Sequence, residues 1–516
     1  MTDPVGRRPG CRVPLIVLFV LVTLVVTSTS ARLAADADEW WRVDGIPHLA
    51  ATGVMLVVSS VLITALPRAA KEFWQWSGPF PSVAERVLKA LVRPLKAVGV
   101  VSTVLVLGLG SCVLLPSPLE TGELVIMTAS DLSPGDPRNT LVEQWNESRP
   151  RHRARIVTAA GETDEQHERI TSDARQDGEH EADIYVLDVV WMTEFIDNGY
   201  LRAVDRSNSG DDLDDFMAPA RRTCEVGDEL WALPLNTDVG LIYHRTDIPG
   251  ITPPTSWDGH SGIPAAEARG GLEAANTAQF SGEMFMVEAL EAIRAAGGEV
   301  VTEDGDVTLT PDKSRVRFTK NDYEGMRKLN AETRTPGVAL DDPLPEDTTA
   351  PDAVEQFAKG RTAFMRNWAV AREQLTDRRD ELDAAGVTFR AAIPPTPSVL
   401  GGQNLAISAH TDEPKAAQAL VEFLTSAQSQ QILAEIGGFA PTRDSVYDRA
   451  RGEHLGQVRG ALRDAGLRPR TANYTEFSRA FRAAVKSVVT AQDVISDDTA
   501  RELAEILRKG RPGGSG

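Results

Sequence analysis

The side chains best suited to chemistry in this sequence are those that could hold a ligand rich in hydroxyl groups. Asp188, Asn236, Asp238 and Arg443 supply carboxylate, amide and guanidinium groups, which form paired hydrogen bonds with neighbouring hydroxyls. Trp368 supplies an indole ring on which the apolar face of such a ligand can stack. Asp188 ends a predicted buried strand, and ligands of open α/β sheets bind at the carboxyl ends of strands. These residue types indicate ligand binding.

Each of these side chains also has a structural explanation. Asp188 could cap the helix that follows its strand, and Asn236 could lie in a turn. Trp368 could pack in the core, and Arg443 could form a surface salt bridge. Tyr243 is expected to pack at a hinge rather than to contact a ligand. These alternatives stay open at the level of sequence.

An enzyme active site is not expected. The sequence has no GxSxG, HExxH or GxxxxGK[ST] motif, and no GxGxxG motif after a strand. Its 8 histidines are scattered singly. Its 3 cysteines, Cys11, Cys112 and Cys224, form neither a disulfide framework nor a zinc-binding spacing, and Cys224 is expected to be a buried free thiol. We therefore expect no catalytic residue, metal or cofactor.

The charge of the chain argues against a nucleic-acid partner. The 516 residues carry a net charge of −20, and the acidic excess lies after residue 116, since basic side chains outnumber acidic ones before it. An acidic body repels phosphates instead of attracting them.

Three uncharged apolar runs, 13–31, 49–66 and 97–115, predict three transmembrane helices, because each is close to the ~20 residues that cross a bilayer. Basic residues precede the first run and dominate 67–96, whereas 32–48 is net acidic. By the positive-inside rule, the chain after about residue 116 lies outside the cell. The alternative is a signal peptide followed by a buried core helix.

The third run contains Leu109-Gly110-Ser111-Cys112 near its end, which is typical of a lipoprotein signal. In one interpretation the true start lies downstream of Met1, or processing removes residues 1–111, and Cys112 is lipidated. In the other, Cys112 is a small apolar residue at the outer end of a third span. Both interpretations tether the acidic body outside the membrane.

Strands and helices alternate after residue 120. Strands are predicted in 123–130, 153–161 and 182–191, with helices between them, and a helix in 282–298 ends at Gly297. This alternation predicts an α/β fold with a mainly parallel sheet. A loop is expected over 340–352, and the tail 509–516 is expected to be disordered.

Six segments carry a recognisable pattern in a fixed order, in 182–205, 229–248, 253–259, 355–371, 399–431 and 436–448. Among them are "ELWALPLNTDVGLIYHRTDI", "FAKGRTAFMRNWAVA" and "IGGFAPTRDSVYD". Together they resemble the carbohydrate-binding proteins of ABC importers, nearest to the trehalose/maltose branch. The resemblance implies a two-lobed clamshell of type II that closes on a sugar. It implies one lobe of about 120–237 and 402–440, and another of about 243–395 and 441–508.

Two positions depart from that pattern. Gln403 stands where the family has a tryptophan, next to Gly402, whose missing side chain could let backbone approach a ligand. Losing an aromatic platform could cost ~1–3 kcal/mol of ligand affinity, or the amide of Gln403 could bond a more polar ligand. Phe280-Ser281 also differs from the family. Both changes put trehalose or maltose specificity in question.

The leading hypothesis is therefore a membrane-anchored binding protein, not an enzyme, on the extracellular face of the cell membrane. It would capture a carbohydrate, a di- or oligosaccharide, and deliver it to the permease subunits of an ABC importer. The alternative is a membrane-tethered sugar sensor that is not coupled to transport. The short segment 67–96 has no recognisable output domain, which disfavours the sensor.

Overall fold

The chain divides into two compact units, Met1–Pro118 and Leu119–Gly516. The computed structural model describes part of the second unit: residues 119–129, 133–135, 137–161, 163–175, 181–206, 210–256, 272, 274–278, 282–334, 338–340, 353–449, 452–491 and 494–509. The three predicted membrane runs, Cys112, Phe280-Ser281, residues 341–352 and the tail from 510 lie outside these ranges. Within these ranges, no helix is both long and apolar enough to cross a membrane.

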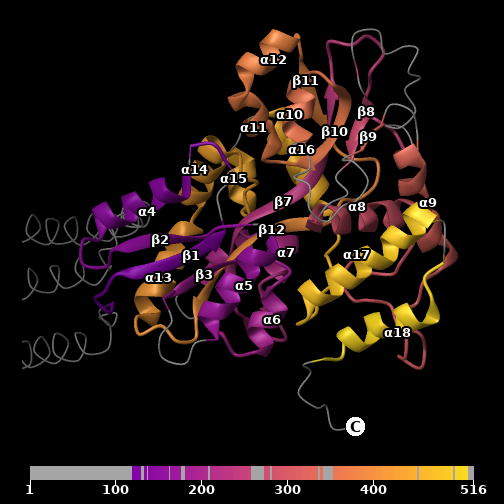
Figure 1. Ribbon diagram of the computed structural model, residues 1–516. Helices are drawn as coiled ribbons and strands as arrows, with labels where there is room; N and C mark the ends of the chain where they lie inside the picture. Colours follow the sequence, from indigo (N-terminus) through magenta and orange to yellow (C-terminus); the bar gives the residue numbers. More distant parts are fainter. Residues whose placement is uncertain are drawn as a thin grey trace, which may run out of the picture. The chain divides into compact units, whose positions relative to one another are not determined.

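Three parallel strands form one end of the main sheet (Figure 1). β1 (Leu124–Ala129) lies between β2 (Ala154–Ala159) and β3 (Ile184–Asp188). Helices α4 (Pro137–Ser148) and α5 (Thr163–Ala174) connect them. All of β1 and the first four residues of β3 are buried, as expected for strands covered on both faces. The strands predicted from sequence in this region are confirmed.

Two long strands carry the chain through the middle of the sheet. β7 (Ala232–Arg245) pairs with β12 (Leu400–Ser408) up to Val239, and the two strands are antiparallel. From Gly240 onward β7 pairs with β10 (Thr362–Trp368) and β11 (Phe389–Ala392) instead. β12 in turn pairs antiparallel with β3. β7 thus belongs to both ends of the sheet.

The sheet order is β2-β1-β3-β12-β7-β10-β8-β9. β8 (Ala274–Ala278) runs parallel to β10 and to β9 (Val338–Leu340). The prediction of a mainly parallel sheet is wrong for the central strands, because β7 and β12 cross between the two parallel ends in opposite directions. The short strands are β4 (Leu201–Arg202), which pairs with β12, and the hairpin β5 (Glu225–Val226) and β6 (Glu229–Leu230).

Helices cover both ends of the sheet and enclose separate apolar cores. The core around β1–β3 includes Trp145 and Tyr185, whereas another contains Phe477 and Phe481. A third surrounds Tyr243. The remaining helices are the 3-10 helix Gly210–Asp215 and α6 (Met192–Asp197), α7 (Ala218–Arg222), α8 (Gly282–Ala295), α9 (Lys320–Arg334), α10 (Ala353–Ala358), α11 (Ala371–Asp377), α12 (Arg379–Ala385), α13 (Pro414–Leu424), α14 (Ala427–Gly437), α15 (Asp444–Arg449), α16 (Glu453–Arg463), α17 (Tyr474–Ala491) and α18 (Asp497–Ile506).

Local signals explain where two of these helices begin or end. α8 ends before Gly297, whose φ of 73° is left-handed, as the sequence predicts. The chain after residue 412 forms two consecutive helices, α13 and α14. Ser426 separates them by accepting a hydrogen bond from the Ser429 amide, which makes it the N-cap of α14.

Candidate functional site

Three predicted ligand residues form one row across the middle of the sheet. Gln403 on β12 lies opposite Asp188 on β3 and, on its other side, opposite Asn236 on β7. Residues directly opposite each other on neighbouring strands project from the same face. A carboxylate and two amides are therefore brought together from positions far apart in the chain, which suits a ligand with several hydroxyl groups.

Gly402 permits the close approach of β12 and β7 beside this row. Its φ is 122°, and a Cβ there would lie 2.4 Å from the carbonyl oxygen of Asn236. Only glycine fits such a conformation without strain. Asn236 is 6% exposed, and its side-chain oxygen has no hydrogen-bond partner within the described part of the chain. An unpaired buried amide oxygen is costly, so this atom can gain from a donor on a ligand.

Asp188 is half-buried and has two partners. Its Oδ1 accepts a hydrogen bond from the Val190 amide at 3.1 Å and from Nη2 of Arg468 at 2.6 Å. The N-cap of the following helix, α6, is Trp191, which makes no side-chain cap. The Asp188 carboxylate therefore stabilises the turn after β3 and does not cap α6.

Arg468 links Asp188 to a second carboxylate. Its Nη1 donates to Glu283 on α8 at 3.0 Å, and Glu283 also accepts hydrogen bonds from Tyr474 and Ser478 on α17. Arg468 is 4% exposed. Burial would lower the pKa of Arg468, but its two carboxylate partners raise it above the ordinary value. The guanidinium stays charged and connects β3 with α8.

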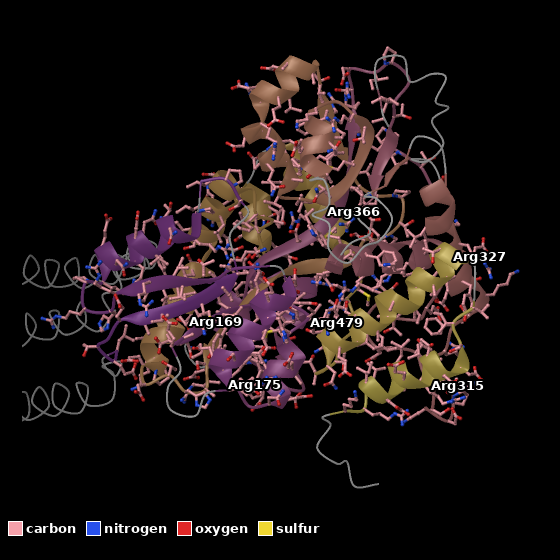
Figure 2. All side chains as sticks on the ribbon, viewed as in Figure 1. Arg169, Arg175, Arg315, Arg327, Arg366 and Arg479 are labelled. Atoms are coloured by element: carbon pink, nitrogen blue, oxygen red, sulfur yellow. The ribbon has the colours of Figure 1, made fainter. Side chains whose placement is uncertain are left out.

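A pocket lies beside Arg468, between the turn after β3 and the segment 467–470. Arg470, from the same segment, donates to the carbonyl of Glu225 on β5, and Arg222 on α7 pairs with Asp304. Arg479 on α17, labelled in Figure 2, pairs with Asp164 on α5. The pocket is lined by Val189, Val190, Met192, Thr193, Thr223, Val226, Leu467, Arg468, Pro469 and Arg470.

Asp238 lies two residues beyond Asn236 on β7, opposite Gly401. Its Oδ1 accepts hydrogen bonds from the amides of Val239 and Ala369, both at 3.1 Å. Burial raises the pKa of Asp238 to about 7, although these hydrogen bonds and nearby arginines lower it. A carboxyl group that is partly protonated near neutral pH can both donate to and accept from a hydroxyl.

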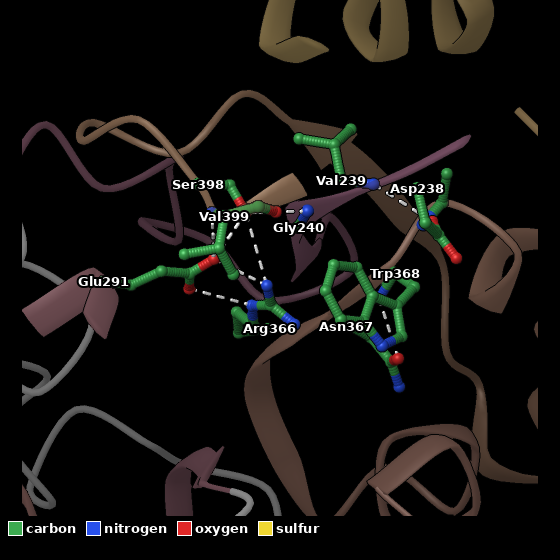
Figure 3. A network of polar contacts seen from close by, with 10 residues as sticks. Asp238, Val239, Gly240, Glu291, Arg366, Asn367, Trp368, Ser398 and Val399 are labelled. Atoms are coloured by element: carbon green, nitrogen blue, oxygen red, sulfur yellow. Dashed lines mark hydrogen bonds and ion pairs between the residues drawn. The ribbon is translucent and has the colours of Figure 1, made fainter. Parts of the chain in front are cut away.

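Trp368 ends β10 next to Asp238. Its ring lies against the Arg366 guanidinium, whose Cζ is 4.4 Å from the ring centroid (Figure 3). A Cβ at Gly401 would lie 3.2 Å from the indole, so glycine there leaves room for the ring. Tyr243 is fully buried and donates to the carbonyls of Trp368 and Ala369. Tyr243 thus packs where β7 passes β10. The Trp368 side chain itself is half-buried.

Comparison with known proteins identifies the family of this chain. Residues 141–457 match the family model described as bacterial extracellular solute-binding protein. The chain belongs to that family. It is a family of solute-binding proteins, not of enzymes, and its binding domain is extracellular.

Known relatives agree with this assignment. A probable ABC transporter-binding protein of Deinococcus radiodurans is 27% identical over 335 residues, which cover 60% of this solute-binding protein and 76% of the relative. The maltose-bound structure of T. maritima MalE3 is similar with a TM-score of 0.59 and 24% identity, covering 75% of this chain and 99% of that one.

A second solved structure, UgpB from Mycobacterium tuberculosis in complex with glycerophosphocholine, has a TM-score of 0.61 and 18% identity. It covers 75% of this chain and 98% of the other. These similarities show that the solute-binding protein has the two-lobed periplasmic-binding-protein fold. The predicted lobe boundaries remain a prediction.

Of the predicted site residues, Asp188, Asn236, Gly402, Gln403, Asp238 and Trp368 lie on adjoining strands of the solute-binding protein. Arg443 has a different environment. It is 1% exposed, donates to the carbonyl of Thr425, pairs with Asp215 at 3.5 Å and lies over the ring of Phe216. The Arg443–Asp215 pair is therefore not a salt bridge on the surface. The role of Arg443 as a clamp for ligand hydroxyls remains a prediction.

Sequence reasoning missed Arg468 and Glu283. Arg468 is 280 residues from Asp188, and no spacing or periodicity connects them. The only local signal is the run Arg468-Pro469-Arg470, two arginines in an acidic chain. By contrast, Cys224 is confirmed as a buried free thiol.

Proposed function

We propose that this solute-binding protein captures a carbohydrate, a di- or oligosaccharide, for an ABC importer. The observation that carries the proposal is the row of Asp188, Gln403 and Asn236, with Asp238 and Trp368 on the next strands. Sugars offer hydroxyls to carboxylates and amides, and C–H faces to aromatic rings.

The charge balance of the site supports a neutral ligand. Asp188 and Glu283 share one arginine, Arg468, and Asp238 is partly neutral because burial raises its pKa to about 7. With no unpaired cation among these residues, a strongly anionic ligand gains little from charge. The structure of MalE3 with maltose is consistent with a sugar at such a site.

The transport role rests on the family and on the Deinococcus relative, a probable ABC transporter-binding protein. We propose permease subunits as partners and anchoring at the cell membrane through the apolar runs or a lipid on Cys112. Labelling cells with a radioactive fatty acid tests the lipid. Label that disappears in Cys112→Ala supports it, and an unlabelled full-length protein rules it out.

Thermal unfolding of the purified full-length protein tests binding. Maltose, trehalose, longer maltodextrins and glycerophosphocholine are added at saturating concentrations. A ligand at 100 times its Kd stabilises the folded state by about 2.7 kcal/mol, which raises the Tm.

Trp368→Ala should remove the rise in Tm caused by a sugar, while Arg501→Ala, at an exposed pair with Asp498, should preserve it. A rise with glycerophosphocholine alone would redirect the proposal to a phosphodiester ligand. A sugar-induced rise that survives Trp368→Ala would remove Trp368 from the site.

A further inference from the structure

We propose that Arg366 is a positioning residue for the ligand site, which holds the indole of Trp368 in the orientation that a bound sugar meets. The inference rests on the proposed function, because Trp368 is taken as a ligand contact. Arg366 itself need not touch the ligand.

Arg366 is held rigidly by a buried acid. Its Nε donates to Glu291 Oε2 at 3.0 Å, and its Nη2 donates to Glu291 Oε1 at 2.6 Å. The two side chains are 5% and 4% exposed. A two-pronged arginine–carboxylate contact fixes the plane of the guanidinium as well as its position.

Ser398 connects this ion pair to both crossing strands. Its hydroxyl donates to Glu291 and accepts hydrogen bonds from the Gly240 amide at 2.9 Å and from Arg366 Nη2 at 3.3 Å. The Val399 amide donates to Glu291 at 3.2 Å. Figure 3 shows Glu291, Gly240, Ser398 and Val399 around the guanidinium of Arg366. These residues belong to α8, to β7 and to the two positions just before β12.

The guanidinium of Arg366 also contacts the indole of Trp368. Arg366 Cζ lies 4.4 Å from its ring centroid, within the range of a cation–π interaction. Within the described part of the chain, Arg366 Nη1 has no hydrogen-bond partner. The guanidinium also needs Gly240 beside it, since a Cβ there would lie 2.4 Å from Nη2.

Stability alone does not account for such a network. Buried ion pairs can often be replaced by apolar side chains of similar volume at little cost, because removing charges from water is expensive. A planar cation that is fixed in orientation, however, can set the tilt of the ring that rests on it. Apolar side chains in place of Arg366 and Glu291 would fill the same volume, but they would not fix the orientation of the Trp368 indole.

The test replaces both charges at once, so that no buried carboxylate is left without a partner. The double variant Arg366→Met with Glu291→Leu is made in the full-length protein, with and without Trp368→Phe. Subtracting the fluorescence of the Trp368→Phe protein isolates the emission of Trp368. We expect this emission to shift to longer wavelength and to become more accessible to acrylamide in the double variant.

Sugar affinity provides the second measurement. If maltose binds the wild type, the double variant should lose roughly 3- to 30-fold in affinity, the equivalent of one cation–π contact. In a Trp368→Ala background the same two substitutions should cause no further loss. Equal losses in both backgrounds would overturn the proposal, since Arg366 would then act independently of Trp368.

The fluorescence measurement needs no ligand, so it separates this inference from the proposed function. A wild type that binds no sugar refutes the proposed function, whereas unchanged Trp368 emission refutes the positioning role. If the double variant does not fold, Arg366→Lys replaces it, because lysine keeps a cation beside Glu291 but has no planar guanidinium. Unchanged Trp368 emission in Arg366→Lys would then overturn the proposal.

Discussion

Arg468 and Asp188 form an ion pair of 2.6 Å, although they are 280 residues apart in the chain. The pair joins the end of β3 to the segment that precedes α17. It also means that a carboxylate expected from sequence to bind a ligand already has a protein partner. A ligand at Asp188 must therefore share the carboxylate with Arg468 or bind its second oxygen.

Replacing Arg468 with methionine should strongly destabilise the fold. The change leaves Asp188 and Glu283 close together without their common cation, and breaking a buried pair costs roughly 3–5 kcal/mol. Because Asp188 is 25% exposed at its side chain, water should reduce this to about 3 kcal/mol. Urea unfolding measures the change. A loss no larger than that of Arg501→Ala, at an exposed pair, would contradict it.

The carboxyl group of Asp238 should make the free energy of unfolding depend on pH. Its pKa is raised to about 7 by burial, above the ordinary value of roughly 4, so the folded state binds the proton more tightly. The stabilisation that the protonated Asp238 gives the folded state is therefore fully present below about pH 4, and it is lost as pH rises to about 7. We expect a decrease on the order of 2 kcal/mol over this interval, since Asp238 is only half-buried.

Unfolding in urea at several pH values checks this dependence. Asp238→Asn keeps an oxygen that can accept from Val239 and Ala369, and it removes the titration. The difference in stability between wild type and Asp238→Asn should change between about pH 4 and about pH 7. A difference that stays constant would show that Asp238 titrates normally.

Gly402→Ala should destabilise the protein by roughly 2–3 kcal/mol. The φ of 122° opposes a side chain, and an added Cβ would lie 2.4 Å from the Asn236 carbonyl oxygen. Gly456 on α16 is the matched control. A Cβ there meets no atom within 4 Å, so Gly456→Ala should stabilise its helix by up to about 1 kcal/mol. Equal effects of the two changes on urea unfolding would refute the explanation.

Arg443→Met should reduce stability by about 3 kcal/mol. The change removes the donor to the buried carbonyl of Thr425 and the cation beside Asp215, which keeps its hydrogen bonds from Ser445. If Arg443 serves the fold, the affinity of the folded variant for a sugar should equal that of wild type. Isothermal titration at a temperature where the variant is fully folded makes the comparison. A large loss of affinity would instead assign Arg443 the clamp role predicted from sequence.

Local sequence signals were sufficient for much of the fold. The apolar runs that became β1, β2 and β3 and the glycine at 297 that ends α8 act over a few residues. The break at Ser426 is also local, but it lies inside a continuous helical pattern, and its cap becomes evident only from the bond to Ser429.

The site was predictable in part, because strand ends and a family resemblance point to Asp188, Asn236 and Trp368. The antiparallel centre of the sheet was not predictable, since it depends on the pairing of β7 with β12, which are separated in the chain by residues 246–399. Arg468 and Glu291 were missed for the same reason. Their partners lie on other elements, and an isolated charged residue looks like a solvated one until its neighbours are known.

β7 exchanges its pairing partners at Val239 and Gly240, from β12 to β10. Rotation of one half of this domain against the other would change the dihedral angles at that exchange, where β7 passes from one set of strands to the other. Asp238 and the main-chain partner of Trp368, Gly240, are at this same place. A substitution at this exchange is therefore expected to alter both the predicted ligand contact of Asp238 and the movement of the two halves.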